Sequence, residues 1–266
     1  MEEVNDIAFR LLCKKAGAGI TFTGMMNPQN PQPVDLDDKP VLQLFCTSPK
    51  AIPEFMKKYD SKVCAWDFNL GCPAKTARKN GFGVFLHHDL ETIEIILKTM
   101  RENTKKPLLI KIRKSKYTMK IIQIANKYCD AICIHPRTQA QGYSGKPDLD
   151  FAINIKKFTQ LPMIYSGNVD DKNYKEFLKI FDYVMIGRTA IGNPNIFSNF
   201  VGKETNLNFN DYLELAKNYK LPFRQLKFQA MCFSKGKKNA KEIREEIFKI
   251  KTLKELKEFT RNKLLE

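Results

Sequence analysis

The chain lacks any apolar run that approaches the roughly 18 to 20 residues needed to cross a bilayer. It also lacks a basic leader, because Met1 is followed by Glu2 and Glu3, where a secretory signal would carry positive charge. We therefore expect a cytoplasmic protein that does not associate with membranes.

Histidine is scarce, with only His87, His88 and His135, and these offer no second half-site at zinc spacing for the pair Cys129 and Cys133. We expect no metal. Cysteine occurs seven times, an odd number in a chain without an export signal, so free thiols are expected rather than a disulfide framework.

Acidic residues are in deficit, at 29 Asp plus Glu against 45 Lys plus Arg, which gives a net charge of +16. Such an excess is typical of a protein that binds a polyanion, although a general preference for lysine is an alternative explanation. Residues 201–266 hold 16 basic and 9 acidic side chains, so the tail is the denser basic region.

A dinucleotide fingerprint is missing, because Gly17-Ala18-Gly19 has neither the third glycine nor a preceding strand. Short β-branched and aromatic runs alternate instead with helix-length segments, which predicts parallel strands joined by right-handed crossovers. The predicted strands are Gly19–Phe22, Val41–Phe45, Val63–Phe68, Leu108–Ile112, Ala131–Ile134, Met163–Tyr165 and Tyr183–Ile186. The predicted helices that accompany them span residues 5–16, 49–58, 89–103, 117–128, 148–158 and 171–180, with 189–200 following the last strand.

A TIM (β/α)8 barrel fits this alternation, but it needs eight strands and the pattern contains seven. The strand that should precede the first helix is missing, so either the barrel is open or the true N-terminus lies upstream. After about residue 205 the predicted elements are all helical, at Asp211–Asn218, Pro222–Ser234, Ala240–Ile250 and Leu253–Leu265. We therefore predict a barrel domain over 1–204 and a small all-helical domain over 205–266.

The segment Asn69-Leu70-Gly71-Cys72-Pro73-Ala74-Lys75 places a thiol on a loop directly after an apolar run. The carboxyl ends of barrel strands hold the active site in α/β enzymes. A lone cysteine is often only a small buried hydrophobe. Here Gly71 and Pro73 indicate a tight backbone and Asn69 can orient a ligand, which favours a working thiol.

Two strands carry polar side chains toward the expected barrel interior. Gln43 interrupts Val41–Phe45, and an amide there needs a hydrogen-bond partner, either a contact inside the barrel or a ligand. Lys111 and Arg113 alternate, so both point to one side of a buried strand. Two cations need an anion, which favours a negatively charged ligand over a buried carboxylate pair.

Strand-end loops contain further candidates. His135 and Arg137 share a loop that continues into a glycine-rich stretch, which favours a functional role, whereas His87 and His88 precede a helix start and are predicted to be surface or capping residues. Asn168 after the sixth strand, and Gly187 with Arg188 after the seventh, occupy the places where barrels bind phosphate. The predicted ligand is therefore phosphorylated.

The chain resembles the tRNA-dihydrouridine synthases. The motifs that carry the resemblance are Asn69-Leu70-Gly71-Cys72-Pro73-Ala74-Lys75, Lys111-Ile112-Arg113, His135-Pro136-Arg137-Thr138, Gln141-Gly142-Tyr143-Ser144-Gly145 and Met185-Ile186-Gly187-Arg188. The resemblance is to archaeal or bacterial members. In the family a strand ending in Pro-Met precedes the region of Val4, and only Met1 corresponds to it here, so this chain is expected to be short at the N-terminus.

The resemblance implies an FMN-containing barrel and a helical domain that together bind tRNA, with NADPH or NADH as reductant. It implies that Cys72 gives a proton to C5 of a uracil ring while a hydride reaches C6. It assigns cofactor contacts to Gln43, Asn69, Lys111, His135, Asn168, Gly187 and Arg188, and substrate contacts to Arg113 and Arg137. We expect a monomer.

Two other functions stay open. One is a small-molecule FMN oxidoreductase on the same barrel, against which the basic tail argues. The other is a non-catalytic RNA-binding relative that has lost FMN. The first of these predicts a yellow protein, as does the synthase, and the second a colourless one.

Overall fold

The computed structural model describes residues 3–264, so Met1 and Leu265, which two of the sequence predictions include, lie outside the described residues. The chain divides into two compact units, Met25–Gly187 and Met1–Gly24 with Arg188–Glu266. These units differ from the predicted domains 1–204 and 205–266, because the first helix shares a hydrophobic core with the C-terminal helices. The functions assigned to those domains stay predictions.

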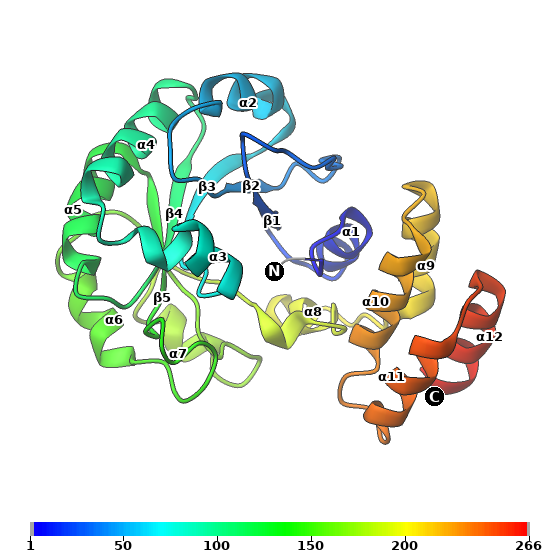
Figure 1. Ribbon diagram of the computed structural model, residues 1–266. Helices are drawn as coiled ribbons and strands as arrows, with labels where there is room; N and C mark the ends of the chain where they lie inside the picture. The colour runs from blue at the N-terminus through cyan, green and yellow to red at the C-terminus, as the bar shows by residue number, and fades with distance from the viewer. Residues whose placement is uncertain (1–2, 265–266) are drawn as a thin grey trace. The chain divides into compact units, whose positions relative to one another are not determined.

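A seven-stranded sheet in the order β1-β2-β3-β4-β5-β6-β7 forms the frame of the barrel, and each strand from β2 onward pairs in parallel with the next. Figure 1 shows the sheet curling, with helices along its outer side. The predicted barrel with seven strands is confirmed. The strands are β1 Phe22–Met26, β2 Val41–Leu44, β3 Ala65–Leu70, β4 Leu108–Arg113, β5 Ala131–His135, β6 Met163–Tyr165 and β7 Tyr183–Val184.

Two strands lie later in the chain than predicted. The first begins at Phe22 rather than Gly19, since Ile20 is 62% exposed and packs against no core while Met26 is buried. The third begins at Ala65 rather than Val63 and runs through Leu70, and all six of its residues are buried. The end of β3 therefore includes Asn69, which the sequence pattern had placed in the following loop.

Helices connect the strands of the first unit. They are α2 Ile52–Tyr59, α3 Lys75–Asn80, α4 Leu90–Glu102, α5 Thr118–Tyr128, α6 Leu149–Lys156 and α7 Tyr174–Leu178, with the 3-10 turns η1 Asp60–Lys62 and η2 Gly83–Leu86. Helix α3 and both turns were not predicted. Asp89 and Asp148 begin α4 and α6 by accepting hydrogen bonds from backbone N–H groups.

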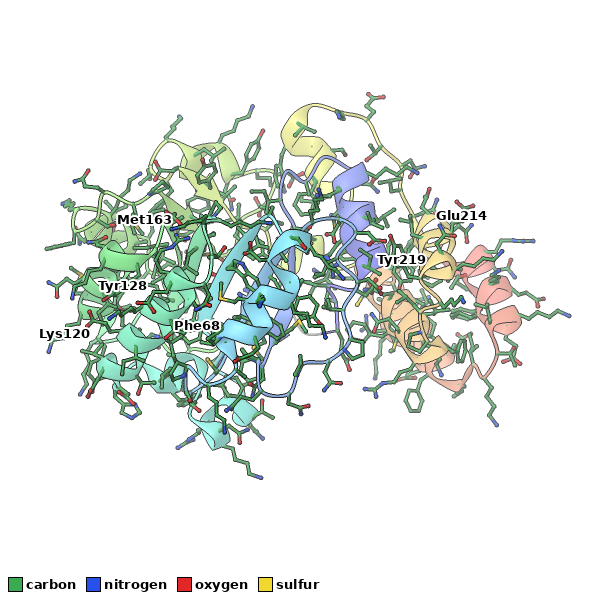
Figure 2. All side chains as sticks on the ribbon, turned by 90° about the horizontal axis from the view of Figure 1, so that it is seen from above. Phe68, Lys120, Tyr128, Met163, Glu214 and Tyr219 are labelled. Carbon is green, nitrogen blue, oxygen red and sulfur yellow. The ribbon has the colours of Figure 1, made fainter. Side chains whose placement is uncertain are left out.

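Outward-facing strand residues and the inner faces of these helices form one hydrophobic core, in which Phe68 and Met163 are fully buried. Lys120 extends from the outer face of α5 into solvent (Figure 2). The apolar burial on this side leaves the inner side of the sheet to polar residues.

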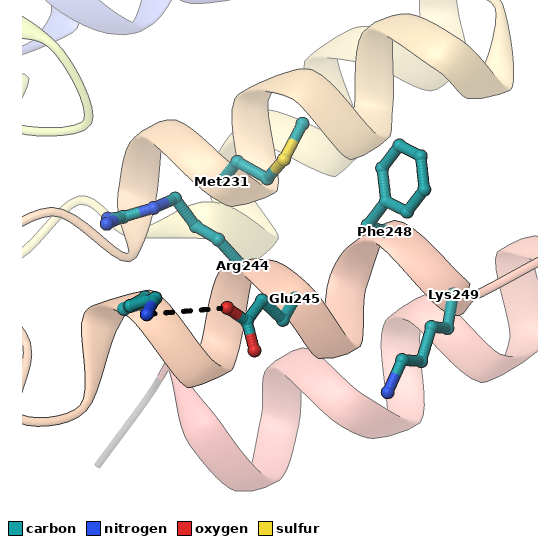
Figure 3. Close-up of a pocket in the computed structure, with 6 residues that line it drawn as sticks. Met231, Arg244, Glu245, Phe248 and Lys249 are labelled. Carbon is teal, nitrogen blue, oxygen red and sulfur yellow. Dashed lines mark ion pairs between the residues drawn. The ribbon is translucent and has the colours of Figure 1, made fainter.

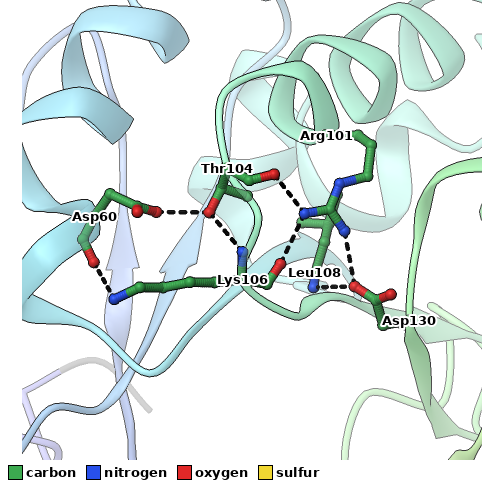
Figure 4. Close-up of polar contacts among 6 residues, drawn as sticks. All are labelled: Asp60, Arg101, Thr104, Lys106, Leu108 and Asp130. Atoms are coloured by element: carbon green, nitrogen blue, oxygen red, sulfur yellow. Dashed lines mark hydrogen bonds and ion pairs between the residues drawn. The ribbon is translucent and has the colours of Figure 1, made fainter.

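Polar contacts tie the amino ends of β3, β4 and β5 together (Figure 4). The Asp60 carboxylate accepts hydrogen bonds from Trp66 Nε1 at 2.8 Å and Thr104 Oγ1 at 2.6 Å. Arg101 donates to the Thr104 carbonyl and pairs with Asp130 at 2.8 Å. This network lies at the end of the strands opposite to the Cys72 loop, so it stabilises the frame.

The second unit is helical, with α1 Ile7–Lys15, α8 Ile196–Val201, α9 Phe209–Asn218, α10 Phe223–Phe233, α11 Ala240–Lys249 and α12 Leu253–Lys263, and the turn η3 Arg188–Ala190. Its core includes Phe9 edge-on to Phe233, with ring centroids 6.3 Å apart. Asp6 accepts hydrogen bonds at 2.7 Å from Gln225 and from Gln229, while burial raises its pKa. The four predicted C-terminal helices are confirmed. No helix in the described part of the chain has the length and apolar character of a membrane span.

Candidate active site

The Cys72 loop begins where β3 ends. The Asn69 side-chain oxygen accepts hydrogen bonds from the backbone N–H groups of Gly71 at 3.0 Å and Cys72 at 2.9 Å. This turn closes before α3 starts at Lys75. Cys72 is partly exposed, and its thiol forms no hydrogen bond with any residue from 3 to 264. The thiol is therefore held on an ordered backbone and stays accessible.

All three backbone carbonyls around this thiol have partners. Leu70 O lies 2.6 Å from His87 Nε2, Gly71 O accepts from Arg113 Nε at 2.8 Å, and Cys72 O accepts from Val84 N at 3.2 Å. Together with the Asn69 turn, these contacts constrain the backbone on both sides of the thiol.

A chain of amides joins the Cys72 loop to the middle of the sheet. Asn69 Nδ2 donates to Gln43 Oε1 at 2.8 Å, and Gln43 Nε2 donates to Asp67 Oδ2. Because a carboxylate oxygen accepts, this sequence of bonds orients both amides. The two residues predicted from sequence, Gln43 and Asn69, are thus brought together.

Asp67 is the buried end of that chain and was not among the predicted residues. It is fully buried, and its Oδ1 atom has no hydrogen-bond partner among the described residues. Burial raises its pKa to about 7, opposed by the Gln43 hydrogen bond and the charge of Lys111. The sequence signal that could have identified Asp67 is a carboxyl group inside the largely apolar stretch Ala65–Leu70.

Lys111 lies on the same inner face, in register with Asn69 on one side and Cys133 on the other. Lys111 is half-buried, and its ammonium forms no hydrogen bond or ion pair within residues 3–264. The carboxylate alternative left open by the sequence is met in part, because Asp67 lies close enough to interact with its charge. Lys111 still has its donors available for a ligand.

Arg113 is also inward-facing but is 1% exposed and bonded to the protein. Besides Gly71, its guanidinium donates to the carbonyls of Thr138 at 3.2 Å and Gly142 at 2.7 Å, and it lies 5.4 Å from the ring centroid of Tyr143. This arginine connects the Cys72 loop to the loop that follows β5.

His135, Arg137 and Asn168 form a second cluster. Arg137 Nη1 lies 2.8 Å from His135 Nε2, and its Nη2 donates to Asn168 Oδ1 at 3.0 Å. Arg137 also donates to the carbonyls of Ser144 and Gly145. Two arginines predicted to face substrate therefore hold the loop 138–145, in which Tyr143 is 55% exposed.

The remaining predicted phosphate residues lie after β7. A Cβ built on Gly187 would meet no described atom within 4 Å, so this backbone is open to close approach. Asn168 adopts a left-handed conformation with φ of 52°, as strand-end loops that bind ligands often require. Arg188 begins η3 in the helical unit, where its carbonyl accepts from Lys235 Nζ.

His87 and His88 were predicted to be surface or capping residues, and the surface alternative is wrong for His87. His88 is exposed and His87 caps the turn η2, but His87 is only 2% exposed. The apolar run Phe82–Leu86 that leads into His87 folds under the Cys72 loop and buries it. That run was the signal that could have found it.

Comparison with known proteins gives a match to Dihydrouridine synthase (Dus) over residues 1–266. The chain is 30% identical over 214 residues to the probable tRNA-dihydrouridine synthase of Helicobacter pylori. It is 29% identical over 221 residues to tRNA-dihydrouridine synthase B of Escherichia coli K12. These matches cover 72% and 74% of this chain, and 65% and 68% of the relatives, so the chain spans about two thirds of their length.

Solved structures with the same fold are far less similar in sequence. A variant of NCR from Zymomonas mobilis is 11% identical with a TM-score of 0.51, over 80% of this chain and 88% of that one. A morphinone reductase variant in complex with tetrahydroNAD is 10% identical with a TM-score of 0.51, over 79% and 86%. These likenesses concern the barrel fold. The family match over the full length shows that this chain belongs to the dihydrouridine synthase family, as its motifs predicted.

Proposed function

We propose that this chain is a tRNA-dihydrouridine synthase, which reduces the C5–C6 double bond of uridines in tRNA with FMN and NADPH or NADH. The observation that supports this most is the accessible Cys72 thiol. It lies on a loop whose backbone is held by hydrogen bonds, beside a row of inward-facing polar residues. A thiol placed in this way can act as a general acid.

The inner face of the sheet suits an anionic ring system such as reduced FMN. Lys111 offers a cation that has no hydrogen-bond partner among residues 3–264, which suits the negative charge, and the unpaired buried oxygen of Asp67 can accept from a ring N–H group. We assign the flavin contacts to the predicted residues Gln43, Asn69, Lys111, His135, Asn168, Gly187 and Arg188. When bound and reduced by NADPH or NADH, FMN would supply the hydride that uracil C6 receives.

Cys72 then completes the reduction. Its S–H bond breaks and a C–H bond forms at uracil C5, which leaves a thiolate that takes a proton back from solvent before the next turnover. Because Asn69 and Arg113 hold the backbone before Cys72 and Val84 N–H holds the Cys72 carbonyl, the sulfur does not have to be positioned anew for each substrate.

We keep Arg113 and Arg137 as substrate contacts, acting through the loop that they hold. Their guanidinium groups donate to backbone carbonyls of residues 138–145. The exposed ring of Tyr143, on a loop that two arginines support, suits stacking with a flipped-out base.

The region 205–266 we assign to tRNA binding, with residues 1–204 as the FMN-binding catalytic part. A hollow of about 430 Å³ lies on α10 and α11 (Figure 3). It is lined by Met231, Lys241, Arg244, Glu245, Phe248 and Lys249. Phe248 is 76% exposed, and Lys227 Nζ lies 5.5 Å from its ring centroid. An exposed ring among cations suits base stacking next to phosphates.

The experiment that tests the proposal starts with the visible spectrum of the purified protein and the dihydrouridine content of tRNA before and after incubation with NADPH. We expect a yellow protein that forms dihydrouridine. Cys72→Ala should retain the flavin spectrum and lose turnover on tRNA, whereas the exposed control Cys64→Ala should keep it.

Three outcomes would count against parts of the proposal. Normal uridine reduction by Cys72→Ala would exclude the thiol as proton donor. A yellow protein that reduces no tRNA would favour a small-molecule FMN oxidoreductase. A colourless protein that binds tRNA would favour a non-catalytic relative. Cytoplasmic location and a monomeric state stay predictions.

A further inference from the structure

His87 joins the ends of two neighbouring strands beneath the Cys72 loop. Its Nε2 lies 2.6 Å from the carbonyl of Leu70, the last residue of β3, and its Nδ1 lies 2.8 Å from Ser115 Oγ, two residues after β4. The ring is 2% exposed. Burying the two polar ring nitrogens costs desolvation free energy, which an apolar residue filling the same space would avoid. The imidazole is therefore better explained by its two hydrogen bonds than by packing alone.

The chemistry of the partners determines the protonation of the ring. A backbone carbonyl can only accept, so Nε2 must bear the hydrogen. Nδ1 then accepts from the Ser115 hydroxyl, whose oxygen in turn accepts from Tyr117 N–H at 3.2 Å. Burial lowers the pKa of His87 to about 4, so the ring is neutral in neutral solution.

The segment that contains His87 also packs directly against Cys72. Val84 N–H donates to the Cys72 carbonyl at 3.2 Å, and a Cβ built on Gly83 would lie 3.0 Å from the Cys72 Cβ. His87 therefore ends a short segment that contacts the loop at Leu70 and again at Cys72. Loss of the His87 contact with Leu70 should therefore also displace the Val84 contact with Cys72.

We propose that His87 is a positioning residue for the Cys72 thiol, which holds the end of β3 through the Leu70 carbonyl and takes its own orientation from Ser115. The inference rests on the proposed function for its catalytic consequence, but the placement of the thiol can be measured without it. His87 touches no reacting atom in this scheme and acts only through the backbone.

The first test needs no activity. In the ¹⁵N-labelled protein, NMR should show His87 as the Nε2–H tautomer and His135 as the Nδ1–H tautomer, because His135 Nε2 accepts from Arg137. The Nδ1–H tautomer has no hydrogen on Nε2 to donate to the Leu70 carbonyl, so observing it at His87 would overturn the proposal.

The second test measures the thiol itself by alkylation with iodoacetamide, resolved by peptide mass spectrometry, with the exposed Cys64 as internal reference. His87→Leu should increase the alkylation rate of Cys72 relative to that of Cys64 by about threefold or more, because the loop opens more readily. His87→Gln keeps an N–H donor and should restore the original ratio. An unchanged ratio in His87→Leu would contradict the proposal.

The third test is turnover in the flavin-loaded enzyme. His87→Leu should leave flavin reduction by NADPH unchanged and slow single-turnover oxidation by tRNA by about 10-fold to 100-fold, as expected for a displaced catalytic group. His87→Gln should recover most of the rate, and the control His88→Gln should match the parent. If His87→Leu oxidises its flavin with tRNA at the parent rate while Cys72→Ala is inactive, only the proposed role of His87 is refuted. Full activity in Cys72→Ala would instead refute the proposed function.

Discussion

Gly83→Ala tests whether close packing under the Cys72 loop is needed for catalysis. Gly83 has a φ of 65°, and a Cβ added there would lie 2.7 Å from the Cys72 carbonyl oxygen. Ordinary contact begins near 3.4 Å, so the Cys72 backbone has to move by roughly 0.7 Å to admit the methyl group. The substitution therefore acts on the loop that holds the thiol.

Gly81→Ala is the matched control for backbone strain. Gly81 has a similar φ of 72°, but the nearest atom to its Cβ position is Thr47 Cγ2 at 4.0 Å. Both variants incur about 1 to 2 kcal/mol for an alanine in the left-handed region. Only Gly83→Ala adds an overpacking cost of about 1 to 3 kcal/mol.

Urea unfolding gives the stability of both variants, and flavin oxidation by tRNA in a single turnover gives their rates. We expect Gly83→Ala to be about 2 kcal/mol less stable than Gly81→Ala and to react about 10-fold to 100-fold more slowly. Equal stability and equal rates for the two variants would refute the view that packing under Cys72 positions the thiol.

Three further predictions concern other parts of the chain. Folding raises the pKa of Asp67 from 3.8 to about 7, so the parent protein loses the stability that the neutral acid contributes as pH rises through 7. Asn does not titrate, so Asp67→Asn should gain about 3 kcal/mol of unfolding free energy relative to the parent between pH 5 and pH 8. Urea unfolding at both pH values checks this, and a constant difference would contradict it. Asp60→Ala should cost about 2 kcal/mol by leaving the buried Trp66 indole N–H unpaired, with the rate per folded enzyme unchanged. Phe248→Ala should weaken tRNA binding by about 1 to 3 kcal/mol in a filter-binding titration, and unaltered affinity would exclude stacking there.

The barrel could be predicted because its central strands, β3 to β6, are almost entirely buried. Continuous apolar runs such as Ala131–Ile134 indicate strands covered on both faces, and alternation with helices indicates parallel order. The short 3-10 turns and α3 were missed, since segments of three to six residues have no periodicity to detect.

The candidate site was predictable where a polar residue interrupts such a run. Lys111 stands out in Leu108–Arg113, and Gln43 in Val41–Leu44, and both face the inner side of the sheet. Asp67 has the same signature and was overlooked. Its partner could not be known from sequence, because Gln43 lies 24 positions away and meets it only through the pairing of β2 with β3.

By itself, the sequence determined the strand order, the position of the thiol at a strand end and the polar character of the inner face, because burial and alternation are local properties of the chain. Tertiary structure alone decided which groups hold that thiol. His87 was expected to be a surface or capping residue, and it becomes a buried partner of Leu70 only because residues 83–87 fold back under the end of β3. Arg113 likewise binds backbone carbonyls 25 or more positions away. Hydrogen bonds of this kind depend on distances between distant segments, which only the folded chain defines.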